Sequence, residues 1–324
     1  MAGVSIVDGL KLVSAALTCT NRPVLAQVVV TRYCNLDCGY CNEYDKVSKP
    51  VPINDLLARI DALARLRTLA VTLTGGEPLT HPHLEKVIAR IRGHGMMATM
   101  ITNGFLLTTE RIKKLNAAGV QEMQISIDGV SPDEVSLKSL KSLRRKLGLL
   151  SKHAAFHVNI NSVLGISEER TRDALEVAGV AKALGFSHTV GVLHDEDGTL
   201  APLSATQMQV HAELMAMGKS LTHKLNYLTF QKNLMEGAPN QWRCRAGARY
   251  LYICEFGLVH RCSQQRGYPG TPLVDYTVGD IVREYHTPKG CAPYCTLGCV
   301  HNASLLDEWR GRQTLKDAYV PVGA

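Results

Sequence analysis

Short runs of apolar and β-branched residues alternate along the chain with longer segments of helical periodicity. After the first run, apolar residues recur at spacings of three and four between Ile53 and Leu66, a pattern typical of an amphipathic helix. The alternation repeats six times and predicts strands at 25–31, 69–74, 97–102, 122–128, 156–163 and 187–193. Strands that alternate with helices form parallel sheets. The sequence therefore predicts an α/β fold, a partial (β/α)6 TIM-like barrel.

Helix signals fall between these strands. Thr108 or Thr109 caps one helix that stops at Gly119, a long basic helix is expected over 135–152, and another is capped by Ser167 and ended by Gly185. Active-site residues gather at the carboxyl ends of barrel strands. Polar or glycine residues stand at all six predicted strand ends, namely Cys34, Gly75, Asn103, Asp128, Asn161 and His194.

The last hundred residues have a different pattern, because glycines and Pro293 interrupt short aromatic and β-branched runs. We expect an N-terminal extension at 1–23, a barrel at 24–230, and a small loop-rich lobe that binds a cluster at 240–324. Apolar residues between Ile6 and Leu17 form one face of a possible N-terminal helix. Packing against the barrel is the simpler interpretation, and peripheral membrane contact is the alternative.

Composition narrows the class of protein. The chain has 324 residues, of which 45% are hydrophobic, so it can bury a sizeable core. It lacks an apolar run long enough to cross a bilayer and a secretory signal pattern, which predicts a cytoplasmic protein. The net charge is +7, and the densest basic stretch, 138–152, is expected to form a solvated helix face. No nucleic-acid motif accompanies it, so nucleic acid is not an expected partner.

Cysteine placement is more informative than cysteine number. Of the 10 Cys, Cys34, Cys38 and Cys41 lie on one short segment, six lie in the last quarter, and Cys19 stands alone. Disulfides are rare in a reducing compartment, so tight groups predict metal sites. A structural zinc site needs four ligands, and no further Cys or His follows the triplet until His81. Three thiolates instead suit a [4Fe–4S] cluster with one open iron.

The segment CNLDCGYC after the first strand and TGGEP after the second resemble the radical S-adenosylmethionine (SAM) superfamily over about residues 24–200. The resemblance implies a partial (β/α)6 barrel in which the amino and carboxylate groups of SAM chelate the open iron. An electron from the cluster then cleaves SAM to methionine and a 5′-deoxyadenosyl radical, which abstracts a substrate hydrogen atom. It also implies a low-potential electron donor such as flavodoxin or ferredoxin.

The resemblance further implies SAM-binding residues. Gly75, Gly76 and Glu77 would accept hydrogen bonds from the SAM ammonium group, and Tyr40 would pack against adenine. Ribose and carboxylate contacts would come from Ser126 and Asp128, and weaker candidates are Asn103 and Asn161. No catalytic acid or base is identified. His194 and Asp195 could serve, although a solvated loop is the favoured interpretation.

The second cysteine group resembles the SPASM and twitch auxiliary domains, because Cys244-x12-Gly257-x4-Cys262 matches their opening. One SAM-binding cluster plus two auxiliary clusters with four Cys each would need about eleven thiolates, and the chain has 10 Cys. We therefore expect at least one auxiliary [4Fe–4S] cluster, held by Cys244, Cys262 and two of three further cysteines, Cys291, Cys295 and Cys299. Two auxiliary clusters are the alternative, if one of them has an open or non-cysteine ligand position. Cys254 is ambiguous, and a zinc lobe that includes His301 is the alternative.

Three functions follow from these patterns. The leading hypothesis is a radical SAM oxidoreductase or maturase that oxidises or rearranges a small molecule in a biosynthetic pathway. A peptide maturase is the alternative, which we rank lower because the first strand begins near residue 25 and leaves little room for a leader-binding domain. A zinc-stabilised, non-catalytic binding protein is the remote alternative.

Overall fold

The computed structural model describes residues 14, 17–164, 168, 170–192, 203–217 and 231–310. Nine strands of this part form one sheet in the order β6-β5-β4-β3-β2-β1-β7-β8-β9. Their bounds are β1 Leu25–Thr31, β2 Ala70–Gly75, β3 Met97–Thr102, β4 Glu122–Ser126, β5 His157–Leu164, β6 Ser187–Val192, β7 Tyr250–Ile253, β8 Leu258–His260 and β9 Pro269–Pro272. The six strands predicted from the sequence are confirmed, each within two residues at either end.

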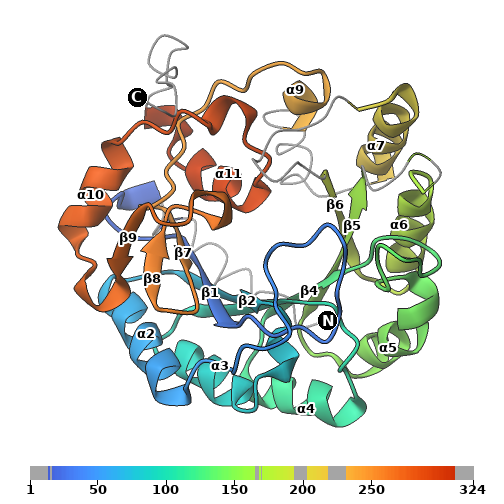
Figure 1. Cartoon of the computed structure of the whole chain (residues 1–324), viewed down its shortest axis with the longest axis horizontal. Coiled ribbons are helices and arrows are strands. Elements are labelled where there is room, and N and C mark those ends of the chain that lie inside the picture. Colours follow the sequence, from blue (N-terminus) through green and yellow to red (C-terminus); the bar gives the residue numbers. More distant parts are fainter. Residues whose placement is uncertain are drawn as a thin grey trace.

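The sheet curves, and a row of helices covers its outer face (Figure 1). Strands β1 to β6 pair in parallel with their sequence neighbours, and the sheet remains open between β6 and β9. This arrangement confirms the partial TIM-like barrel. The helices are α2 Ile53–Arg65, α3 Leu84–Gly93, α4 Thr109–Ala118, α5 Leu140–His153, α6 Asp173–Ala183, α7 Ala205–Met217, α9 Lys232–Met235, α10 Val278–His286 and α11 Gly298–Leu305.

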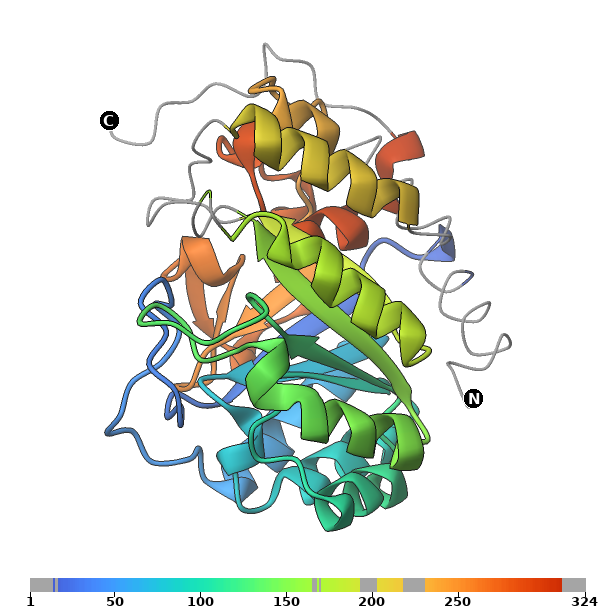
Figure 2. The same cartoon turned by 90° about the vertical axis from the view of Figure 1, so that its right-hand side faces the viewer.

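The main core lies between the sheet and the outer helices, and a second apolar cluster packs α11 on the inner side. Alternate strand residues such as Leu73 and Met123 are buried against the apolar faces of the helices, where Leu56 and Ile60 of α2 are fully buried. Side chains on the other face of each strand point into the curve of the sheet. That concave face is where the chain has room for ligands. Figure 2 shows α6 and α7 extending this layer toward the C-terminal part of the chain.

Two helix starts differ from the sequence prediction. Helix α5 begins at Leu140 instead of 135, because the side chain of Ser139 caps it by accepting a hydrogen bond from the Ser142 amide at 3.2 Å. The preceding residues form a loop that is tied to the side chain of Asp133. Helix α6 begins at Asp173. The predicted cap Ser167 lies outside the described residues, as does most of the expected N-terminal helix.

The C-terminal lobe shares the barrel's sheet. Strand β7 pairs in parallel with β1, and β8 and β9 continue the sheet as antiparallel strands. Arg249 forms a fully buried ion pair with Asp307 at 2.8 Å, and its guanidinium also donates to the carbonyl oxygens of Cys19 and Arg22. The lobe predicted at 240–324 is thus joined to the start of the barrel by both backbone and side chains.

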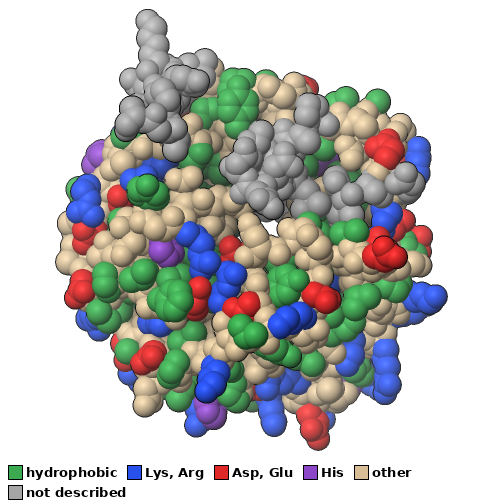
Figure 3. Space-filling model, viewed as in Figure 1, with side chains coloured by type: hydrophobic (Ala, Val, Ile, Leu, Met, Phe, Trp, Pro, Cys, Tyr) green, Lys and Arg blue, Asp and Glu red, His purple; other side chains and the backbone are tan. Residues whose placement is uncertain are grey.

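Two surface properties bear on partners. None of the described helices has the length and apolar content needed to cross a membrane. Basic and acidic side chains are interspersed on the face shown in Figure 3. Lys141, Arg144 and Arg145 of α5 are exposed as predicted. Lys146 is half-buried and donates to the Leu107 carbonyl, and Lys138 precedes the capped helix and turns inward.

Candidate functional site

Three cysteines on the loop after β1 surround one cavity of about 150 Å³. Cys34 and Cys38 are buried, and all three thiols line the cavity. Burial raises the pKa of the Cys34 and Cys41 thiols, and the neighbouring cysteines add to this increase. A metal cluster would reverse the effect, because thiolates are stabilised by the cations they bind. The three thiols therefore suit an iron–sulfur cluster chemically and in position.

The Gly75-Gly76 turn closes one side of the cavity. Gly75 has a φ of +132°, and a Cβ on Gly76 would overlap the carbonyl oxygens of Arg32 and Tyr33. The amide of Gly76 donates to the Thr31 carbonyl at 2.9 Å. Only glycine allows this close approach. The turn is thereby fixed to the root of the cysteine loop, and both glycines line the cavity as predicted.

Glu77 lies behind the turn. Its carboxylate is fully buried and accepts hydrogen bonds from the Leu79 amide at 2.9 Å, the Thr102 hydroxyl at 2.6 Å and the Asn103 amide at 2.7 Å. Burial raises the pKa of this carboxyl, and the three donors oppose that effect. Three protein donors thus fix the carboxylate, and Glu77 orders the turn in this structure. Its contact with the SAM ammonium group stays a prediction.

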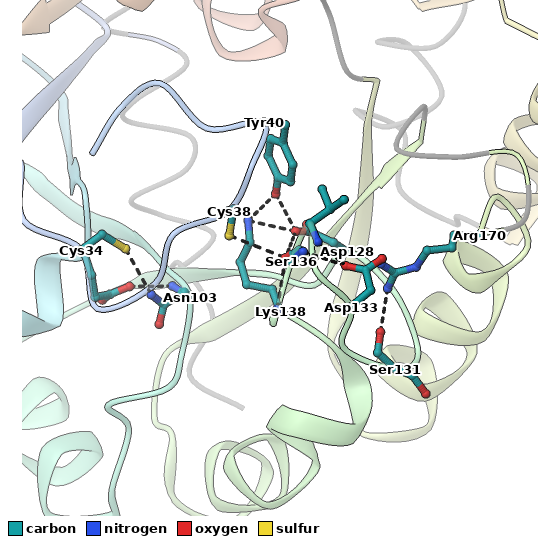
Figure 4. A network of polar contacts seen from close by, with 12 residues as sticks. Cys34, Cys38, Tyr40, Asn103, Asp128, Ser131, Asp133, Ser136, Lys138 and Arg170 are labelled. Atoms are coloured by element: carbon teal, nitrogen blue, oxygen red, sulfur yellow. Dashed lines mark hydrogen bonds and ion pairs between the residues drawn. The ribbon is translucent and has the colours of Figure 1, made fainter. Parts of the chain in front are cut away.

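Asp128 is the centre of a polar network beside the cysteine loop (Figure 4). Its Oδ2 atom accepts hydrogen bonds from the Tyr40 hydroxyl and the Ser136 hydroxyl, both at 2.6 Å, and lies 3.1 Å from Lys138 Nζ. Ser136 Oγ is also 3.6 Å from Cys38 Sγ. Burial, followed by the charge of Asp128, raises the pKa of Tyr40, so the phenol stays a donor. The network holds the cysteine loop against the end of β4.

The predicted SAM-binding residues occupy two positions relative to the cavity. Asn103 and Ser126 line it, whereas Tyr40 and Asp128 belong to the supporting network. Asn161 lies elsewhere, on β5, where its side chain accepts a hydrogen bond from Thr189 at 2.9 Å. His194 and Asp195 fall outside the described residues.

Sequence reasoning missed Lys138, whose side chain lines the cavity. Its ammonium group lies over the ring of Tyr40 at 4.9 Å from the centroid and pairs with Asp128. An ammonium group at this position can donate hydrogen bonds to the carboxylate of a ligand. One feature of the sequence could have identified it. Lys138 immediately precedes the cap residue Ser139, so it lies before the helix and is not part of its solvated face.

A second group of buried thiols lies in the C-terminal lobe. Burial, together with the charges of Cys244 and Cys291, raises the pKa of Cys262 to about 12. The pKa of Cys295 is raised by burial and by Cys244, Cys262 and Cys291. These four thiols are therefore neighbours in space. No three of the described His, Cys, Asp and Glu side chains are close enough to share one metal ion, whereas thiolates of a multi-iron cluster bind different irons and stand further apart.

Cys299 packs against the same apolar cluster as Cys295 but differs from these four in its hydrogen-bond partner. Its thiol hydrogen-bonds to Tyr250, and its side chain lines a different cavity inside the curve of the sheet. The sequence left open which two of three cysteines join Cys244 and Cys262. The electrostatic interactions of the Cys262 and Cys295 thiols favour Cys291 and Cys295 as the other two ligands. Cys254 is buried in the same apolar cluster as Cys244 and Cys262.

We predict that this difference will appear in iron content. Replacing Cys295 with Ala should remove the auxiliary cluster, with a loss of about four irons per chain, because one of its four ligands is lost. Cys299→Ala is the matched control and should keep those irons. Iron and acid-labile sulfide analysis of both anaerobically purified variants measures this, and equal iron loss in the two would contradict the assignment.

A sequence model of the Radical SAM superfamily matches residues 28–195. The AdoMet-dependent heme synthase of Methanosarcina barkeri is 30% identical over 181 residues, which are 51% of this chain and 49% of that protein. The chain spans about half the length of the curated relatives it matches.

Two solved structures resemble the whole fold. Streptococcus suis SuiB bound to its precursor peptide SuiA has a TM-score of 0.61 at 15% identity, and the likeness covers 87% of this chain and 70% of SuiB. The anSMEcpe structure with AdoMet and a Cp18Cys peptide has a TM-score of 0.56 at 14% identity, with coverage of 89% of this chain and 98% of that one. At these identities the likeness concerns the fold.

Proposed function

The chain belongs to the radical SAM superfamily, and from that premise we propose that it removes a hydrogen atom from a substrate held inside the barrel. The family's [4Fe–4S] cluster, with SAM on its open iron, supplies the one-electron cleavage that makes this possible. The observation that supports the proposal is the shared cavity. Three thiols, the Gly75-Gly76 turn and polar groups of Asn103, Ser126 and Lys138 line it together.

The chain's own residues would hold the cofactors as follows. Cys34, Cys38 and Cys41 would bind three irons and leave the fourth open. Lys138 and Ser126 would bind the SAM carboxylate, because a buried cation and a hydroxyl are suitable donors to it. Backbone carbonyls of the Gly75-Gly76 turn would accept from the ammonium group.

The auxiliary site favours net oxidation. A cluster on Cys244, Cys262, Cys291 and Cys295 could accept the electron that a substrate radical must lose to become an oxidised product. The electron for SAM cleavage would come from a flavodoxin or ferredoxin. Cys41, the exposed member of the triplet, marks the side from which such a donor could approach. A small-molecule substrate remains our leading proposal.

A peptide substrate is the second candidate. The two solved structures described above contain peptides, SuiA in SuiB and a Cp18Cys peptide in anSMEcpe, and their folds cover most of this chain. The zinc-stabilised binding protein is disfavoured by the family assignment.

We predict that the anaerobically purified protein contains about eight irons and eight sulfides per chain, because it would hold two cubane clusters. With dithionite and SAM it should form methionine and 5′-deoxyadenosine. Metal analysis, EPR spectroscopy after reduction and product chromatography measure these quantities. Zinc without sulfide, or no 5′-deoxyadenosine from the iron-loaded protein, would refute the proposal.

A further inference from the structure

A second cavity of about 370 Å³ lies between the concave face of the sheet and helix α11. Residues of β1 to β4 form one wall, and residues of α11, including Asn302, form the other. Figure 1 shows α11 on the inner side of the curved sheet. Ile101 lines both this cavity and the cysteine cavity, so the two adjoin. A molecule held here would extend toward the site of SAM cleavage.

Polar side chains alternate with the buried core residues along the inner wall. Gln27, Thr72, Thr99 and Gln124 all face this cavity. Closed barrels usually fill the same space with bulky apolar side chains. The hydroxyls of Thr72 and Thr99 are 2.6 Å apart, and Gln27 Oε1 accepts a hydrogen bond from Tyr250 at 2.6 Å. This wall offers amide and hydroxyl groups to a polar ligand.

The cavity has one charged group. Glu122, the first residue of β4, is the only ionisable side chain besides Cys299 among the described lining residues, and no Lys or Arg lines it. No described residue hydrogen-bonds or ion-pairs with the half-buried Glu122 carboxylate. His157 is the register partner of Glu122 on β5, but its Nε2 atom is 2.8 Å from Ser187 Oγ. A partly desolvated carboxylate of this kind favours a cation and repels phosphate or carboxylate groups.

The strand geometry fixes a length. Ser126 lines the cysteine cavity, whereas Gln124 and Glu122 line the second one, on the same face of β4. Residues four apart on a strand are separated by about 13 Å. A group bound to Glu122 therefore lies roughly 13 Å along the strand from the level of Ser126 beside the SAM site.

We propose that the substrate is an extended polar molecule with an amine or guanidinium group that binds Glu122, about 13 Å along the strand from the level of the SAM site. The proposal rests on the proposed function, because it assigns a substrate class to the same barrel. The cation could belong to an aminated small molecule or to a basic side chain of a peptide. Both sources share the chemistry that Glu122 recognises.

The test measures binding to the SAM-loaded holoenzyme by calorimetry at pH 7.5 with two pairs of probes. One pair is glucosamine and glucose, and the other is a blocked Gly-Lys-Gly peptide and its norleucine counterpart. We expect the amine-bearing member of at least one pair to bind about tenfold more tightly, since charged hydrogen bonds of this kind contribute about 1.5–3 kcal/mol. The pair that responds identifies the source of the cation.

Glu122→Gln should reduce that preference to less than about twofold, because the amide keeps the shape of the side chain and removes its charge. Glu176→Gln, an exposed position on α6, is the matched control and should keep the tenfold preference. Equal binding within both pairs, binding of no probe, or an unchanged preference in Glu122→Gln would overturn the substrate assignment. SAM cleavage is measured separately in the same samples, so failure of the proposed function is distinguished by the absence of 5′-deoxyadenosine.

Discussion

Replacing Cys38 with Ala should abolish SAM cleavage. Cys38 is one of three thiols in the cysteine cavity, and its Sγ atom lies beside Ser136 of the Asp128 network. Two thiolates cannot hold a cubane and leave only one iron open. Since loss of groups that merely support metal ligands costs 10- to 100-fold, loss of a ligand should exceed about 100-fold. The rate of 5′-deoxyadenosine formation under dithionite measures the effect.

Cys19→Ala provides the matched control. Cys19 lies outside both cysteine groups, and its thiol contacts Asn21 at 2.6 Å. Its replacement should leave SAM cleavage within about twofold of the natural protein, because an isolated partly exposed thiol contributes little to stability. The Cys38 variant should still contain about four irons in the auxiliary site. Full cleavage in Cys38→Ala would show that the triplet does not hold the SAM-binding cluster.

The strands and the cysteine triplet could be predicted because their signals are local. Alternation and β-branched runs determine β1 to β6, and three thiols within one loop are close in any fold. The joining of the C-terminal lobe to the barrel could not be predicted in this way. The pairing of β7 with β1 connects residues more than 200 positions apart, and no local pattern encodes which open strand edge they share.

Side-chain roles were less accessible than the fold. Lys138 belongs by charge to the basic stretch of α5, but Ser139 caps the helix one residue later and leaves Lys138 to turn toward Asp128. Cys291, Cys295 and Cys299 are evenly spaced in the sequence, so spacing does not distinguish them. A break between a short 3-10 turn at Ala292–Tyr294 and α11 lies between Cys295 and Cys299, and the Cys299 thiol hydrogen-bonds to Tyr250.

Glu77 shows how a motif residue can have a role that resemblance does not reveal. Each carboxylate oxygen accepts a backbone amide, Oε1 from Leu79 and Oε2 from Asn103. In Glu77→Gln, either orientation of the new amide places an NH2 group against one of these N–H donors. We expect the apparent free energy of unfolding to fall by about 3 kcal/mol, since hydrogen bonds to a buried charge contribute about 1.5–3 kcal/mol each.

The same substitution should weaken SAM binding about tenfold or more, because the turn that contacts SAM would shift. A displacement of only 1 Å in a residue that positions a ligand can lower activity about 100-fold. Gly76 is the residue before Glu77, and the amide of Asn103 donates to the Glu77 carboxylate. Gly76 and Asn103 both line the cysteine cavity. Urea unfolding of the anaerobic holoenzyme and SAM titration measure the two effects. Glu110→Gln, at an exposed position in the first turn of α4, should change the unfolding free energy by less than about 0.5 kcal/mol. If Glu77→Gln weakened SAM binding and left stability unchanged, Glu77 would contact SAM directly, and the supporting role assigned to it here would be wrong.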